Sequence, residues 1–187
     1  IEILTCTNHN EKVFIVKRLL LILILTFSFQ SLTKADDIRN FEIEGVSLGD
    51  NLLSHISKDK IQKLKENYYK DNLYTAITIF PNETILEFKN FDAIVLNFLT
   101  NDSNYMLQGI SGIIIYENNI FDCKKKSNEI VEEFKSLFKE SEIKNNNFEG
   151  IFGKVISVQF NFKNKDKAIV ACYDYLPHET HTDHLRV

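Results

Sequence analysis

The feature that most constrains the fold is a strict alternation of apolar and polar residues late in the chain. Every second residue from 156 to 162 is apolar, and the residues between them are polar. A period of two places these apolar side chains on one face of a β-strand. The polar residues 163–166 then predict a turn, so that residues 168–175 return as the second strand of a hairpin. The chain is therefore expected to build an antiparallel sheet with one face against a core.

Residues 120–139 have helical spacing instead. One stripe carries the side chains that would face a core: Cys123, Ser127, Ile130, Phe134, Leu137 and Phe138. Lysine and glutamate fill most of the other positions, which predicts an amphipathic helix that Asn118 or Asn119 can cap.

A second helical pattern covers residues 52–64. It forms either one helix or two short ones, the second capped by Ser57. Ser47 and Asp50 before it have the spacing of a capping box, with aspartate in place of the usual glutamate.

Several shorter runs have the composition of strands. They are residues 41–45, 73–80, 85–88, 93–99, 105–116 and 183–187. Residues 85–88 and 93–99 form either two strands or one bent strand, and Gly109 and Gly112 inside a strand indicate a bulge or bend. Glu44 is expected on the exposed face of its strand. The polar residues 144–149 predict a connection.

These elements predict the α+β class, with a mostly antiparallel sheet and two main helical segments. Their order suggests two halves, residues 50–116 and 118–187, each with a helix followed by three strands. We expect one domain over residues 36–187, cut inside its last strand at the C-terminus. The net charge of −4 over 187 residues argues against a nucleic-acid partner, which would need a basic face.

The N-terminal residues are predicted to be a targeting signal rather than part of the folded domain. Lys17 and Arg18 precede an apolar run, residues 19–29, and a polar segment that ends at Ala35. This order predicts a signal peptide over residues 16–35. The run is shorter than the roughly 20 residues of a membrane-spanning helix, although it could also be retained as a signal anchor.

The chain begins with Ile1, and its single methionine is Met106. We therefore interpret Val16 as the start of translation and residues 1–15 as upstream read-through. The protein is expected to be a periplasmic or secreted bacterial protein that meets the membrane only during export.

Two cysteines lie in the predicted domain, Cys123 and Cys172, while Cys6 lies outside it. An exported protein enters an oxidising compartment, where a pair of thiols tends to form a disulfide. The alternative is two separate buried thiols. A redox-catalytic pair is not favoured, because the C-x-x-C spacing is absent.

The only cluster of metal-ligand residue types lies near the end of the chain, at His178, Glu179, His181, Asp183 and His184. Imidazole and carboxylate groups are zinc ligands, so zinc is the one cofactor that the sequence suggests. The alternative is a solvated loop, which the lack of an H-E-x-x-H spacing favours.

No catalytic motif is present, so the catalytic residues are unknown and an enzyme is not favoured. Ser111, Asp174 and His178 are the residue types of a hydrolase, but the sequence does not bring them together. The leading hypothesis is a non-catalytic binding module with an envelope or periplasmic partner protein. A small exported hydrolase and a metal-binding protein are the alternatives.

Three segments together, residues 41–50, 112–131 and 172–175, resemble a group of small uncharacterised exported proteins of AT-rich marine bacteria. The resemblance implies secretion across the inner membrane and continuation beyond Val187, and it implies no activity. Residues 41–50 are also similar to the opening of small envelope α+β modules that act in outer-membrane assembly.

Overall fold

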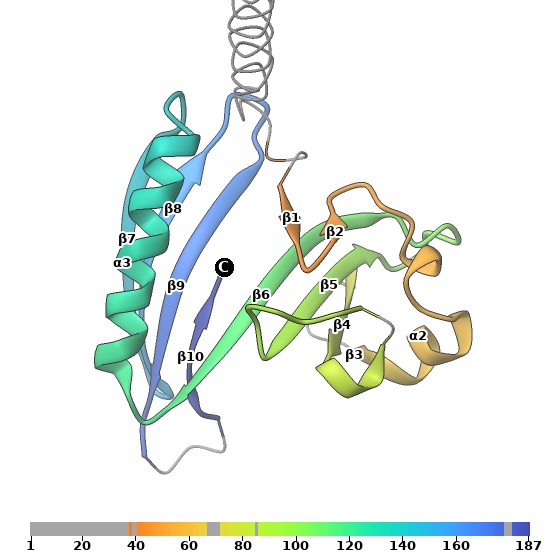
Figure 1. The fold of residues 1–187 in the computed structure, drawn as a ribbon, viewed down its shortest axis with the longest axis horizontal. Helices are drawn as coiled ribbons and strands as arrows, with labels where there is room; N and C mark the ends of the chain where they lie inside the picture. The colour runs from red at the N-terminus through yellow and green to blue at the C-terminus, as the bar shows by residue number, and fades with distance from the viewer. Residues whose placement is uncertain (1–37, 39–40, 67–71, 85, 178–180) are drawn as a thin grey trace, which may run out of the picture. The chain divides into compact units, whose positions relative to one another are not determined.

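The computed structural model describes residue 38 and residues 41–66, 72–84, 86–177 and 181–187 (Figure 1). They belong to one compact unit, Ala35–Val187. The predicted read-through and signal peptide lie outside the described residues. Among the described residues, no helix is both long enough and apolar enough to span a bilayer.

The chain has the predicted α+β class, with α2 (Lys58–Leu64) and α3 (Ile120–Leu137) beside two antiparallel sheets. The small sheet is the hairpin of β1 (Glu42–Ile43) and β2 (Val46–Ser47). The large sheet has the order β3-β4-β5-β6-β10-β9-β8-β7. Its strands are β3 (Lys65–Glu66), β4 (Tyr74–Ile79), β5 (Ala93–Leu99), β6 (Leu107–Glu117), β7 (Glu142–Gly150), β8 (Gly153–Asn161), β9 (Lys167–Tyr175) and β10 (Asp183–Arg186).

The predicted division into two helix-plus-strand halves is present, but each half has four strands rather than three. Strands β3 to β6 follow α2 as one meander, and β7 to β10 follow α3 as another. The two meanders join where β6 pairs antiparallel with β10. Strands β3 and β7 were not predicted from the sequence, because neither has an alternating apolar pattern.

The interpretation of residues 144–149 as a connection is wrong, because they lie within β7 at one edge of the sheet. Every residue of β7 is exposed. An uncovered strand needs no apolar face, and β7 is held by its backbone pairing with β8 from Glu142 to Gly150. Polar and charged side chains on such an edge also discourage pairing with other chains.

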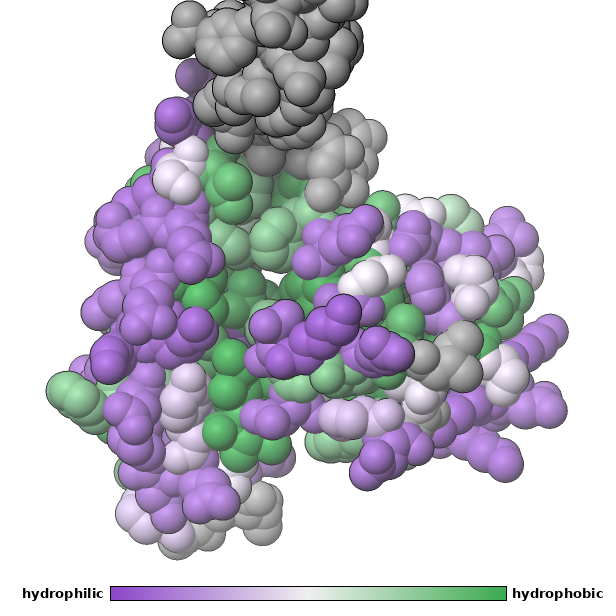
Figure 2. All heavy atoms as spheres, viewed as in Figure 1, coloured by the Kyte–Doolittle hydropathy of each residue, from purple (hydrophilic) through white to green (hydrophobic). Residues whose placement is uncertain are grey.

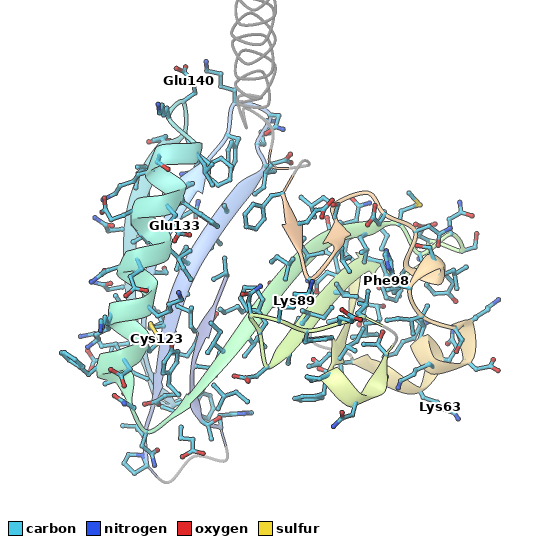
Figure 3. All side chains as sticks on the ribbon, viewed as in Figure 1. Lys63, Lys89, Phe98, Cys123, Glu133 and Glu140 are labelled. Atoms are coloured by element: carbon cyan, nitrogen blue, oxygen red, sulfur yellow. A yellow bond between two sulfur atoms is a disulfide. The ribbon has the colours of Figure 1, made fainter. Side chains whose placement is uncertain are left out.

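The prediction of a strand at residues 85–88 is also wrong for the residues that the structure describes. Residues 86–88 belong to a loop, and residue 85 lies outside the description. Glu44 holds this loop from the β1–β2 turn, where Glu44 and Gly45 both have positive φ. Its carboxylate accepts hydrogen bonds from the backbone N–H groups of Lys89 (2.9 Å), Asn90 (2.7 Å) and Phe91 (3.1 Å). Glu44 is therefore a structural contact rather than a solvated strand residue (Figure 3, where Lys89 is labelled).

The helix ends follow their capping residues. Asp50 does accept a hydrogen bond from the N–H of Ser47 (2.9 Å), but this closes a turn and does not start a helix. The first helical turn, η3 (Leu52–Ser54), begins after Asn51, and α2 begins after Ser57, so the two-helix alternative is correct. The cap of α3 is Asn119, and the helix ends at Leu137, two residues before the predicted end.

Two apolar cores lie on the same face of the large sheet. In one, Ile61 of α2 packs among residues of β4, β5 and β6, with Ile110 at its border. In the other, Phe134 of α3 packs among residues of β8, β9 and β10, with Ile114 at its border. Ile110 and Ile114 are four residues apart on β6, so their side chains point to the same face. Both helices and the β1–β2 hairpin therefore cover one face (Figure 1).

Candidate functional site on the helix-free sheet face

The opposite face of the large sheet carries no helix among the described residues. Its side chains come from the alternate positions of β6, β10, β9 and β8, and neither core contains them. Strand pairing sets Ile115 of β6, His184 of β10 and Tyr173 of β9 side by side. We call this surface the open face.

An aromatic cluster lies on the open face. The ring of His184 stacks on Tyr173, with centroids 4.6 Å apart and planes at 14°, and lies 5.8 Å from the ring of Tyr175. The two tyrosine rings are 6.2 Å apart and nearly parallel, and His181 extends the cluster with a centroid 5.2 Å from Tyr175. This packing keeps four amphipathic rings in one surface region, which we call the Tyr–His cluster.

The position of His184 makes its charged form unfavourable. Burial lowers the pKa of the imidazole, and the nearby charges of Arg186 and His181 lower it further. The carbonyl oxygen of Thr182, 3.0 Å from Nδ1, and the carboxylate of Asp183 act in the opposite direction. Burial is the largest effect, so the ring is neutral at neutral pH and stacks on Tyr173 as an uncharged group.

We expect this histidine to make the stability depend on pH. The unfolded chain binds a proton near pH 6.5, whereas folded His184 binds it only at lower pH. The free energy of unfolding therefore falls as the pH drops through about 6.5, and this contribution levels off below the pKa of the folded state. Thermal melts from about pH 8 to about pH 5 should show a smaller loss for His184→Phe than for the original chain. Equal losses in both proteins would contradict the prediction.

Of the described members of the predicted metal cluster, His181 and His184 belong to the Tyr–His cluster, whereas Asp183 does not. Asp183 is buried, and its Oδ1 accepts a hydrogen bond from the backbone N–H of Tyr175 (2.8 Å). No group of three potential metal ligands exists among the described residues. His178 and Glu179 lie outside them, so the zinc site stays a prediction without support from His181, Asp183 and His184.

The hydrolase residue types are also far apart where they can be placed. Pairing through β10 sets Ile113 of β6 level with Ala171 of β9, and these two strands run in the same direction. Ser111 lies two residues before this level, and Asp174 lies three residues after it. Five strand residues span about 17 Å, so the two side chains do not meet. His178 lies outside the described residues.

The cysteine pair is arranged as a disulfide between α3 and β9. The two Sγ atoms of Cys123 and Cys172 are 2.13 Å apart, and their Cα atoms are 6.0 Å apart. Both residues are buried in the core below α3 (Figure 3, where Cys123 is labelled). This geometry is that of a disulfide and not of the alternative, two separate buried thiols. Cys6 lies outside the described residues.

Fold and surface together define an α+β protein with one helix-covered and one helix-free sheet face, stapled by a disulfide. No protein-family model, curated protein or solved structure matches the chain. Tyr173, Tyr175 and Arg186 were not predicted from the sequence as residues of a functional surface. The spacing of two residues between the tyrosines could have indicated that they share one face of a strand. The strand pairing that brings His184 beside them could not be predicted from the sequence.

Proposed function

We propose that this protein is a non-catalytic exported module that binds a partner protein of the cell envelope through its open face. The observation that carries the proposal is the Tyr–His cluster on a sheet face that no described helix covers. Tyrosine and arginine are enriched at protein interfaces because they combine a large contact area with a polar end.

The surroundings of the cluster support a protein partner. Ile115 and Ile169 are each more than two-fifths exposed, although both are large apolar side chains. Arg186 lies beside His184 on the same strand and supplies a positive charge to the patch. Protein interfaces commonly have such a composition, with apolar and aromatic side chains at the centre and arginine beside them.

The arrangement of the cysteines supports a periplasmic or secreted location. Disulfides persist in oxidising compartments and are rare in the cytosol. The buried pair Cys123 and Cys172 fits such a compartment, as does the signal peptide predicted from the sequence.

Site-specific photocrosslinking in cells of the source organism tests the proposal. A benzophenone side chain in place of Ile115 on the open face should give one discrete adduct with an envelope protein. The matched control places it at Phe121 on α3, which is 74% exposed and lies away from the open face. Identical adducts from both positions, or none from Ile115, would contradict the proposal.

The crosslinked partner then allows a quantitative test. Tyr175→Ala and Arg186→Glu should each weaken its binding by about tenfold or more, as expected for residues at the centre of an interface. Lys125→Glu on the exposed surface of α3 makes the same charge change as Arg186→Glu and should change the affinity by less than about twofold. Unchanged affinity in both open-face variants would refute the assignment of the surface.

A further inference from the structure

Exposed apolar side chains gather at the turn of the β7–β8 hairpin. They are Phe148, Ile151, Phe152 and Leu176. The last pair of the hairpin is Gly150 with Gly153, and residues 151 and 152 between them form the turn. The backbone N–H of Leu176 donates to the carbonyl oxygen of Phe152 (3.1 Å), so Leu176 lies beside this turn. We call these four residues the hairpin tip.

Two glycines meet the steric demands of the turn. A Cβ at Gly150 would come within 2.8 Å of Cε1 of Phe148, so the phenylalanine ring lies over the bare backbone of this glycine. At Gly153, where φ is +143°, a Cβ would overlap the backbone carbonyl of Asp174. The close packing of the hairpin end therefore depends on the glycines and not on the apolar residues between them.

The fold gives no reason for apolar residues in this turn. Glycine, proline, asparagine, aspartate and serine dominate turns, each for a reason of backbone geometry or hydrogen bonding. Ile151 is instead the most exposed of the large apolar side chains that the structure describes, at 80%. No residue of the hairpin tip belongs to either core. Its apolar surface is therefore available to an external partner.

The small size of the hairpin tip favours a lipid bilayer over a protein partner. A stable protein interface takes about 20–30 residues from each side. The tip has four, and residues 144–147 of β7 next to it are all polar and exposed. A bilayer needs no complementary surface, because binding there scales with the apolar area that is buried. Tyr175 lies opposite Gly153, and tyrosine is enriched where an apolar region meets a wet one.

The charges beside the hairpin tip indicate the kind of lipid. Strand pairing sets Glu149 of β7 opposite Lys154 of β8, and Lys154 opposite Asp174 of β9. One cation therefore stands against two carboxylates in this row. Proteins that recognise anionic lipids do so through clusters of lysine and arginine. The hairpin tip fits a zwitterionic phospholipid surface instead.

We infer that the hairpin tip inserts among the headgroups of a zwitterionic phospholipid bilayer, with Ile151 and Phe152 deepest. Interfacial segments reach about 5–10 Å into the boundary between headgroups and acyl chains. The inference goes beyond the proposed function, because it assigns a lipid partner to a different set of residues. It also extends the sequence-based expectation, which limits contact with the membrane to export.

Tryptophan fluorescence tests the inference on the full chain, which has no tryptophan of its own. Phe152→Trp places a single indole at the hairpin tip. Vesicles of phosphatidylcholine with brominated acyl chains quench an indole only where it reaches the bilayer. The fluorescence of this variant should fall by about half or more when these vesicles are added, because the turn enters the boundary with the acyl chains. An unquenched indole would overturn the inference.

The matched control is Leu137→Trp, at the exposed end of α3. Leu137 adjoins Phe138, whose ring lies 5.0 Å between centroids from that of Phe162, just beyond the end of β8. Strand β8 spans about 27 Å, so this indole lies far from the hairpin tip. Figure 2 shows that hydrophilic side chains cover most of the exposed side of α3, so the control should not be quenched.

Equal quenching of the two variants would refute the assignment of the hairpin tip. It would show that another part of the chain, such as the apolar residues 19–29, holds the protein on the vesicle. Quenching that requires anionic lipid, or that is lost when the salt is raised to about 0.5 M, would show an electrostatic contact and contradict the choice of lipid.

An isoleucine pair tests the apolar contact itself. Ile151→Ser in the Phe152→Trp chain should reduce the quenching by about half or more, because it removes apolar area from the inserted turn. Ile143→Ser makes the same change near the other end of β7, where the side chain is also exposed, and should leave the quenching unchanged. Equal effects of the two changes would argue against insertion at the turn.

A second copy of the chain is the other occupant that the experiment can reveal. An emission shift of Phe152→Trp that grows with protein concentration in the absence of lipid would assign the hairpin tip to a dimer and overturn the inference. The crosslinks from Ile115 on the open face do not involve the tip, so the proposed function and this inference can fail separately.

Discussion

Replacing Cys123 and Cys172 together by alanine is expected to lower the free energy of unfolding by about 4 kcal/mol. The two residues are 49 positions apart, and their bond restricts the unfolded chain over that loop. It also fixes α3 to β9 inside the second core, which is the core below α3 that contains Phe134 and Phe160. Urea unfolding of the oxidised protein and of the double variant measures the difference. A loss of this size is a large part of the stability of an ordinary domain.

Counting thiols provides the control for the oxidation state. Both cysteines are almost fully buried, so the alkylating reagent must be added together with a denaturant. Without reductant, the full chain should then react only at Cys6, and after reduction it should react at all three cysteines. Three reactive thiols in the unreduced protein, or equal stability of the double variant, would contradict the prediction.

Phe160→Ala is expected to lower the free energy of unfolding by about 3–5 kcal/mol. Phe160 is fully buried, and its ring lies 5.7 Å from Phe134 and 6.2 Å from Phe138 between centroids. Its removal takes apolar surface from the core below α3 and leaves a cavity. Denaturant unfolding of the oxidised protein measures the effect, with the m-value checking that both proteins unfold in the same way.

Phe148→Ala supplies a matched control for the same chemical change. Phe148 lies on the neighbouring strand β7 and is 67% exposed, so its removal should change the stability by less than about 0.5 kcal/mol. Phe160→Leu keeps most of the apolar volume and should cost less than Phe160→Ala. Equal losses from Phe148→Ala and Phe160→Ala would show that the second core is not where the structure has it.

Periodicity in the sequence predicted the elements that have one covered face. The alternation of residues 156–162 and the stripe of residues 120–139 gave β8 and α3, because each packs one side against the second core. The same reasoning failed for β7, which has no covered face and therefore no apolar pattern. It also failed for residues 86–88, whose apolar side chains pack from a loop that Glu44 holds.

The contacts of Glu44 could not be predicted from the sequence, because the amides that it binds are 45 to 47 residues away. The bulge beside Gly109 was predictable, since a glycine inside a strand is its usual mark. There Gln108 is the extra residue, between Leu107 and Gly109 opposite Phe98 and Asn97.

The candidate surface was harder to predict than the fold. Both tyrosines of the Tyr–His cluster come from β9, and their spacing alone puts them on one face. The sequence could not show that β10 lies between β6 and β9 and brings His184 beside them, because that requires the strand order. The same histidine therefore suggested a metal ligand in the sequence and is a stacked neutral ring in the structure.

The position of β10 has a consequence for how the chain folds. It follows the other described strands in the sequence, yet it lies at the centre of the large sheet and joins the two meanders. Until it docks, the inner edges of β6 and β9 expose unpaired backbone groups, which are templates for aggregation. The pairing of β10 with β6 spans at least 66 residues, so it closes a long loop and belongs to the slow, non-local part of folding. Before β10 docks, the chain therefore holds two partial sheets that are not yet joined.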